Sequence, residues 1–181
     1  MYINKLNIAL LLYFSLGILI YPQGIKEKTY DIIYTELGKD VEIISSKFNI
    51  PLNIKSKVEK DARQYFYSEV VYIFKILKTD SVLSIGILDN VYGKSMPITF
   101  LVLFNIGGDI LSTNVVKYRE PYGSRVKIKN WNDQFKGKNS KSNYKIGEDI
   151  DSISGATISV RSLTKGIRKL TLLYEEIKNK L

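Results

Sequence analysis

The end of the chain carries the pattern that most limits its fold. From residue 157 onward, apolar residues recur at alternating steps of three and four, and charged residues lie between them. This spacing places the apolar side chains on one stripe of an α-helix. The stripe consists of Val160, Leu163, Ile167, Leu170, Tyr174, Ile177 and Leu181. We therefore predict a helix over residues 157–181 that packs against a sheet.

The middle of the chain supplies the strands for such a sheet. Four stretches dense in β-branched and aromatic residues predict strands at 69–77, 82–88, 98–105 and 109–118. Asp89-Asn90 and Gly93 indicate a turn after the second strand, and Gly107-Gly108 indicates a tight hairpin between the last two. We expect an α+β fold in which a curved antiparallel sheet packs against the C-terminal helix.

The residues before the strands read as a mostly helical lead-in. A first helix is expected at 28–37, ended by Gly38, followed by an extended stretch at 41–45. Pro51 then opens a second helix, with the charged run 55–63 on its exposed face. Residues 119–150 are polar and rich in helix breakers, which indicates a long, functional loop. The expected division is a terminal segment at 1–22, the lead-in at 23–65 and the main domain at 66–181.

The terminal segment predicts a membrane anchor. Residues 6–21 are apolar apart from Asn7, Ser15 and Gly17, and the run stops at Pro22. Such a run is at the lower limit for spanning a bilayer and at the upper limit for a signal peptide. No small-residue cleavage site follows, so we favour an uncleaved transmembrane helix. Lys5 places the N-terminus inside, and the rest of the chain then lies outside the cytoplasm, on the periplasmic side.

Composition excludes several kinds of chemistry. The chain has no His and no Cys, so it offers no imidazole base, thiol nucleophile, disulfide or iron–sulfur ligand. We therefore expect a bound cofactor to supply any reactivity. The formal net charge of +9 is spread along the whole chain without a block of like charges, which favours a solvated surface over nucleic-acid binding.

The segment 151–159, Asp-Ser-Ile-Ser-Gly-Ala-Thr-Ile-Ser, is the candidate site. It leads into the C-terminal helix, where the first N–H groups and the helix dipole favour an anion. Ser154 could cap the helix, and Gly155 and Ala156 leave the backbone bare. A phosphate on Thr157 could be stabilised there by Arg161 or Lys165. Taken alone, Ser-Gly-Ala-Thr favours an ordinary helix start, because these four residues occur often by chance.

The spacing Asp151-x-x-Ser154-Gly155-Ala156-Thr157-x-Ser159 resembles the flavinylation signature of the FMN-binding domain family. That family includes the FMN-bearing subunits of sodium-translocating NADH:quinone reductases and Rnf-type complexes, and stand-alone extracytoplasmic flavoproteins. The segments 118–123 and 131–138 resemble the loop and short helix that precede the signature in stand-alone members. The resemblance covers roughly residues 66–181. The His-x-Glu-Thr-Pro-Gly-like segment of the large complexes is replaced here by residues 119–123, which speaks against membership of such a complex.

The resemblance implies a cofactor and a way of attaching it. A separate, Mg²⁺-dependent flavin transferase would move the FMN moiety of FAD onto Thr157, forming a covalent phosphoester. Asp151, Ser154, Gly155, Ala156 and Ser159 then match positions that the transferase recognises or that shape the turn.

Three loop residues are weaker candidates for contact with the flavin ring. Glu120, Tyr122 and Trp131 lie in the region that would approach it, and aromatic faces can stack on a flavin. The alternative for Trp131 is a core position, because a lone tryptophan usually serves packing. Glu120, followed by Pro121, could simply belong to a turn.

We therefore expect an electron carrier on the outer side of the membrane, with covalent FMN, no catalytic residue and no metal ligand of its own. Its partners would be the flavin transferase, the membrane and a membrane-bound redox protein. One alternative is a flavin reductase that acts on an external acceptor. A second is a membrane-tethered binding domain without flavin.

Overall fold

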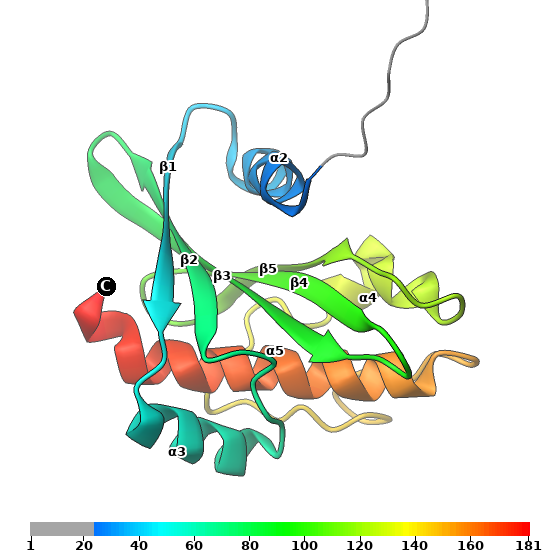
Figure 1. The fold of residues 1–181 in the computed structure, drawn as a ribbon. Helices are drawn as coiled ribbons and strands as arrows, with labels where there is room; N and C mark the ends of the chain where they lie inside the picture. Colours follow the sequence, from blue (N-terminus) through cyan, green and yellow to red (C-terminus); the bar gives the residue numbers. More distant parts are fainter. Residues whose placement is uncertain (1–23) are drawn as a thin grey trace, which may run out of the picture.

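The structure is a computed structural model that describes residues 24–181. Its centre is a five-stranded antiparallel sheet in which the strands follow one another in chain order (Figure 1). The strands are β1 (Glu42–Asn49), β2 (Val70–Lys78), β3 (Ser81–Tyr92), β4 (Pro97–Phe104) and β5 (Ile110–Lys117). The predicted α+β fold with an antiparallel sheet and a C-terminal helix is thereby confirmed.

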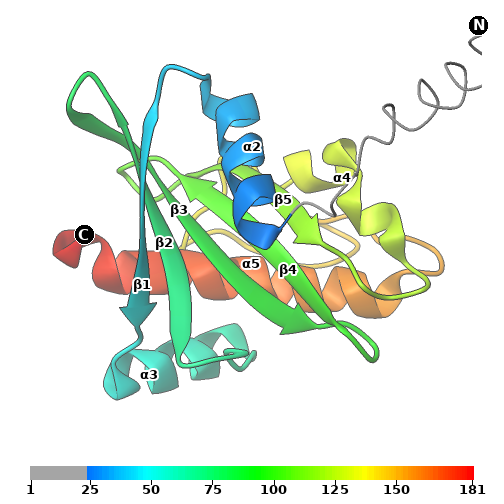
Figure 2. The ribbon, with the colours of Figure 1, turned by 45° about the horizontal axis from the view of Figure 1, so that its top comes forward.

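Helices lie on both faces of the sheet. The long helix α5 crosses beneath all the strands, while α2 lies over the opposite face (Figures 1 and 2). The helices are α2 (Ile25–Leu37), α3 (Leu52–Ala62), α4 (Lys129–Asp133) and α5 (Thr157–Ile177), with the short 3-10 turns η1 (Ser124–Lys127) and η2 (Lys178–Lys180). Helix α5 begins at Thr157 as predicted. Gly38 follows α2 with a φ of 98°, a conformation that glycine adopts without steric cost.

The predicted anchor at 1–22 lies outside the described residues. Within residues 24–181, none of the helices combines the length and apolar character that a membrane crossing requires.

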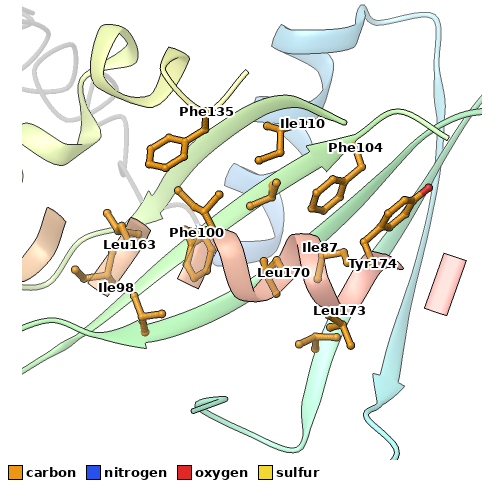
Figure 3. Close-up of a cluster of buried hydrophobic side chains, with 14 of the residues drawn as sticks. Ile87, Ile98, Phe100, Phe104, Ile110, Phe135, Leu163, Leu170, Leu173 and Tyr174 are labelled. Carbon is orange, nitrogen blue, oxygen red and sulfur yellow. The ribbon is translucent and has the colours of Figure 1, made fainter. Parts of the chain in front are cut away.

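Strand β4 shows how the two layers are filled. Ile98, Phe100, Val102 and Phe104 belong to the cluster that α5 covers (Figure 3). The intervening Leu101 and Leu103 belong to a second cluster with Ile33 of α2. Because successive side chains of a strand point to opposite faces, and both faces of β4 are covered, the strand is apolar at every position except Thr99. The predicted stripe of α5 is also confirmed, since its residues from Val160 to Ile177 are buried in the first cluster.

The turn predicted at Asp89-Asn90 is wrong, because both residues lie within β3. The turn comes later, where the Gly93 N–H donates to the Met96 carbonyl at 3.0 Å. Asp89 is 3% exposed and forms an ion pair with Lys169 of α5, with 2.8 Å between the carboxylate and ammonium. Burial raises the pKa of Asp89 and lowers that of Lys169, and the ion pair opposes both shifts. Asp89, whose residue type is common in turns, is therefore a core residue with an ion-pair partner.

The lead-in contains a strand as well as its two predicted helices. Strand β1 pairs with β2 along its full length, from Glu42 opposite Leu77 to Asn49 opposite Val70. The extended stretch predicted at 41–45 therefore continues to residue 49 and forms an edge of the sheet. Helix α3 follows Pro51 as predicted and packs against α5.

Candidate functional site

The chain enters α5 through a tight turn. The Ala156 N–H donates to the Ile153 carbonyl at 3.0 Å, and Gly155 at the third position of this turn has a φ of 77°. Turns of type II need a positive φ at that position, which glycine supplies. A Cβ on Gly155 would meet nothing within 4 Å. Gly155 is therefore required by the backbone conformation, and the space around it is open.

No side chain within residues 24–181 caps the first turn of α5. Ala156 is the N-cap residue, so the predicted capping role of Ser154 is wrong; Ser154 precedes the helix within the turn and is exposed. The N–H groups of Thr157, Ile158 and Ser159 donate to no acceptor within residues 24–181. Unpaired amides and the positive end of the helix dipole together favour an anion.

Thr157 presents its hydroxyl to solvent. The residue is exposed, and its side chain makes no hydrogen bond with the described part of the chain. The hydroxyl is thus accessible to a second protein and is not committed to holding the fold.

A hollow of about 450 Å³ opens beside Thr157. Three segments that are distant in sequence meet there: the β3–β4 turn, the loop after β5, and the start of α5 (Figure 1). The volume is at the lower end of the range for small-molecule sites. The lining residues are Lys94, Ser95, Glu120, Pro121, Tyr122, Gly123, Gly155, Ala156, Thr157, Ile158 and Ser159.

Glu120 ties the loop after β5 to the β3–β4 turn. Its carboxylate accepts hydrogen bonds from the N–H of Ser95 at 2.6 Å and of Met96 at 2.9 Å, and from the Ser95 hydroxyl at 3.0 Å. These bonds, led by that from Met96, hold the pKa of Glu120 below its ordinary value. Glu120 therefore fixes one wall of the hollow as an anion.

The same loop is joined to α5 by contacts among Tyr118, Ser159 and Gly123. The Tyr118 hydroxyl lies 2.8 Å from the hydroxyl of Ser159, which is 5% exposed, and donates to the Tyr122 carbonyl. A Cβ on Gly123, whose φ is 81°, would lie 2.8 Å from the Tyr118 hydroxyl and 3.1 Å from that of Ser159. The close approach of loop and helix thus depends on glycine at position 123.

Trp131 lies apart from this hollow. It is 6% exposed in the main core, and its indole N–H donates to the Asp151 carbonyl at 2.9 Å. The Asp151 N–H in turn donates to Gln134 Oε1 at 2.7 Å. Helix α4 and the residue after it therefore hold the backbone that leads into the turn. A contact between Trp131 and a flavin stays a prediction.

The structure thus brings together most of the predicted site residues. Thr157, Gly155, Ala156, Ser159, Glu120 and Tyr122 line the hollow, whereas Asp151, Ser154 and Trp131 do not.

Lys94 is the charged residue that the β3–β4 turn contributes to this hollow, and it was not identified from the sequence. Among residues 24–181, Lys94 is the cation that lines the hollow, whereas neither Arg161 nor Lys165 does. The sequence signal for the position of Lys94 was the glycine turn at residue 93 together with the strand that follows it. These elements form the β3–β4 hairpin, which carries Lys94 to the end of the sheet where α5 begins.

Residues 93–171 match the family model described as the FMN-binding domain. The match includes the β3–β4 turn, the loop after β5 and the start of α5, which are the three segments that form the hollow. A search of curated proteins found no match. The match bears out the resemblance for this part of the chain: residues 93–171 are similar to the FMN-binding domain.

Proposed function

We propose that this protein carries FMN as a phosphoester on Thr157 and transfers electrons with it on the outer side of a membrane. The observation that carries the proposal is the exposed, uncommitted hydroxyl at the head of α5, inside the region that matches the FMN-binding domain. A buried or hydrogen-bonded hydroxyl at this position would have been out of reach of a modifying enzyme.

The attachment is a transfer from FAD that balances without a redox step. The Thr157 oxygen attacks the phosphorus of the FMN half of FAD, the bond from that phosphorus to the bridging oxygen breaks, and AMP leaves with that oxygen. The hydroxyl proton passes to a base. The resemblance to the FMN-binding domain family implies that a separate Mg²⁺-dependent flavin transferase catalyses this step. The chain itself has no His or Cys, and the one carboxylate that lines the hollow among residues 24–181 is already bound to backbone amides.

The residues around Thr157 fit a phosphate ester joined to an aromatic ring. The unpaired N–H groups of the first helical turn and the Lys94 ammonium provide donors and positive charge for the phosphate. Tyr122, 82% exposed, and Ile158, 47% exposed, offer apolar surface beside it. When bound, FMN supplies reversible one- or two-electron chemistry that no side chain of this protein can supply.

Electron transfer outside the cytoplasm rests on the apolar N-terminal segment. An anchor there would keep the flavin domain at the membrane surface, near a membrane-bound redox partner. A covalent bond suits that setting, because a free cofactor released outside the cell would be lost by diffusion.

The test is to produce the full chain with and without a flavin transferase. With the transferase, we expect the intact mass to increase by roughly 438 Da, the mass of FMN less water, and the denatured band to fluoresce on a gel. Thr157→Val should remove both signals. Ser152→Ala, which removes an exposed hydroxyl from the same segment, should keep both. Label on Thr157→Val, or none on the unmodified sequence despite a transferase active on another substrate, would contradict the proposal and favour the flavin-free alternative.

A further inference from the structure

A second hollow, of about 300 Å³, lies further along α5. It is built from the end of α3, the segment around residues 144–146 and one face of α5. Thr164 on its wall follows Thr157 by seven residues, which places it about 10 Å along the helix axis. The lining residues are Asp61, Ala62, Arg63, Tyr144, Ile146, Thr164, Lys165 and Arg168. None of them lines the hollow at Thr157.

Two buried hydrogen-bonding groups on the wall of this second hollow have no partner. Thr164 is 2% exposed, yet its hydroxyl bonds to nothing in the described chain. The Nε–H of Arg168 is likewise buried and unpaired among residues 24–181. A threonine in a helix usually donates to the carbonyl one turn earlier, as Thr29 does to Ile25 at 2.7 Å. Buried polar groups without partners are uncommon and need an explanation.

The second hollow also gathers positive charge that is not neutralised. Within residues 24–181, Arg63, Lys165 and Arg168 form no ion pair, in contrast to Lys57, which lies 2.6 Å from Glu176. Among residues 24–181, Asp61 is the one carboxylate on the wall, so three cations and one anion leave an excess of two positive charges. Tyr144 adds an aromatic side, and its hydroxyl already donates to the Asn139 carbonyl at 3.1 Å.

We propose that this second hollow binds a phosphate group. Guanidinium, ammonium and hydroxyl donors are the groups that recognise phosphate oxygens, and a phosphate carries a charge of about −1.5 to −2 at pH 7. The ligand satisfies the Thr164 hydroxyl and the Arg168 Nε–H and neutralises the excess charge. Asp61 adds selectivity, because hydrogen phosphate and the monoanion of a phosphate ester keep one P–OH that can donate to a carboxylate, whereas sulfate has none.

Calorimetry on the full chain in detergent, at constant ionic strength, tests the proposal with inorganic phosphate, glycerol 3-phosphate and sulfate. We expect saturable binding of phosphate or its ester at one site and binding of sulfate about tenfold weaker. If the ester binds more tightly, the natural ligand is an organic phosphate. If inorganic phosphate binds more tightly, the natural ligand is the free ion. Absence of saturable binding by either overturns the proposal, as does equal binding of sulfate.

Variants connect the binding to these residues. Arg168→Gln should weaken it by about tenfold or more, because a charged hydrogen-bond donor is lost. Lys165→Gln should also weaken phosphate binding. Because Lys165 is exposed, this substitution should not impair folding. Lys60→Gln is the matched control, since it removes an equal charge from an exposed position on α3 outside the hollow. If Lys60→Gln weakened phosphate binding as much as Lys165→Gln does, the effect would be general electrostatic attraction. That result would overturn the proposed site.

Discussion

Helix α5 differs sharply between its start and its middle. At the start, Thr157 is exposed, the cap is the small Ala156, and the hydroxyl and amides are unpaired within the described chain. In the middle, Lys169 is wholly buried, forms an ion pair with Asp89, donates to the Tyr65 carbonyl at 3.0 Å and lies 4.2 Å from the Phe66 ring. The difference separates the part of the helix that anchors the fold from the part that presents a reactive group.

The largest expected effect is on the anchored part. Lys169→Met leaves the Asp89 charge buried without a partner, which should lower the free energy of unfolding by about 3–5 kcal/mol. Adding Asp89→Asn should recover most of that loss. Denaturant unfolding measures both. Arg161→Met, an exposed cation on the same helix, should change stability by no more than about 0.5 kcal/mol. A loss below about 1 kcal/mol for Lys169→Met would show that the middle of α5 is not anchored by this pair.

Two glycines near the start of α5 should respond unequally to alanine. Both have positive φ, but a Cβ at Gly123 would press on the Tyr118 and Ser159 hydroxyls, whereas a Cβ at Gly155 meets open space. We expect Gly155→Ala to cost about 1–2 kcal/mol for its left-handed backbone alone. Gly123→Ala should cost about 1 kcal/mol more, since the loop and helix must move apart. Equal losses in denaturant unfolding would mean that the loop does not press on the helix start.

Removal of the Tyr118 hydroxyl tests how that loop is attached to α5. Tyr118→Phe leaves the buried Ser159 hydroxyl without its partner at 2.8 Å, which should cost about 1–2 kcal/mol. Tyr65→Phe is the control, because the Tyr65 side chain is 81% exposed and its hydroxyl makes no hydrogen bond within the described residues. Similar melting temperatures for the two variants would argue that Ser159 finds another partner.

The smallest expected effect is a local pH dependence. Hydrogen bonds from Met96 and Ser95 lower the pKa of Glu120 from its ordinary value of 4.5 in the folded protein. The stabilisation is therefore complete above that ordinary value and is lost as the pH falls through the lowered pKa. Amide exchange of Ser95 and Met96 should accelerate over that acidic range. Glu120→Gln should remove this pH dependence; an unchanged profile would mean that other groups govern the turn.

Local patterns predicted most of the elements of this fold. The density of β-branched and aromatic residues predicted β2, β4 and β5, and the 3.6-residue apolar spacing predicted α5, nearly within their observed bounds. The same reasoning placed a turn at Asp89-Asn90, because Asp and Asn are common in turns. The partner that keeps Asp89 inside a strand is Lys169, which is distant in sequence, so no local pattern contains it. Nor does any local pattern tell that α2 covers the second face of the sheet.

The candidate site was predictable to a similar degree. The order of residue types from Asp151 to Ser159 indicated the helix start and Thr157, but exposure of the hydroxyl depends on how the loop after β5 folds against α5. The same dependence explains why Lys94 was missed. Its position follows from the register between β3 and β4, in which Tyr92 lies opposite Pro97. Trp131 contacts the segment through the Asp151 carbonyl, a contact that the lone tryptophan itself did not indicate.

The bare first turn of α5 has a consequence for the order in which this protein is assembled. Its backbone bonds, from Ala156 to Ile153 and from Val160 to Ala156, close without help from the Thr157 side chain. If the proposed function holds, an ester formed on that oxygen would replace no contact among residues 24–181, and the polypeptide could fold first and acquire FMN afterwards. Biosynthesis and flavin attachment would then be separable in time and in place, and the protein without flavin would already be fully folded.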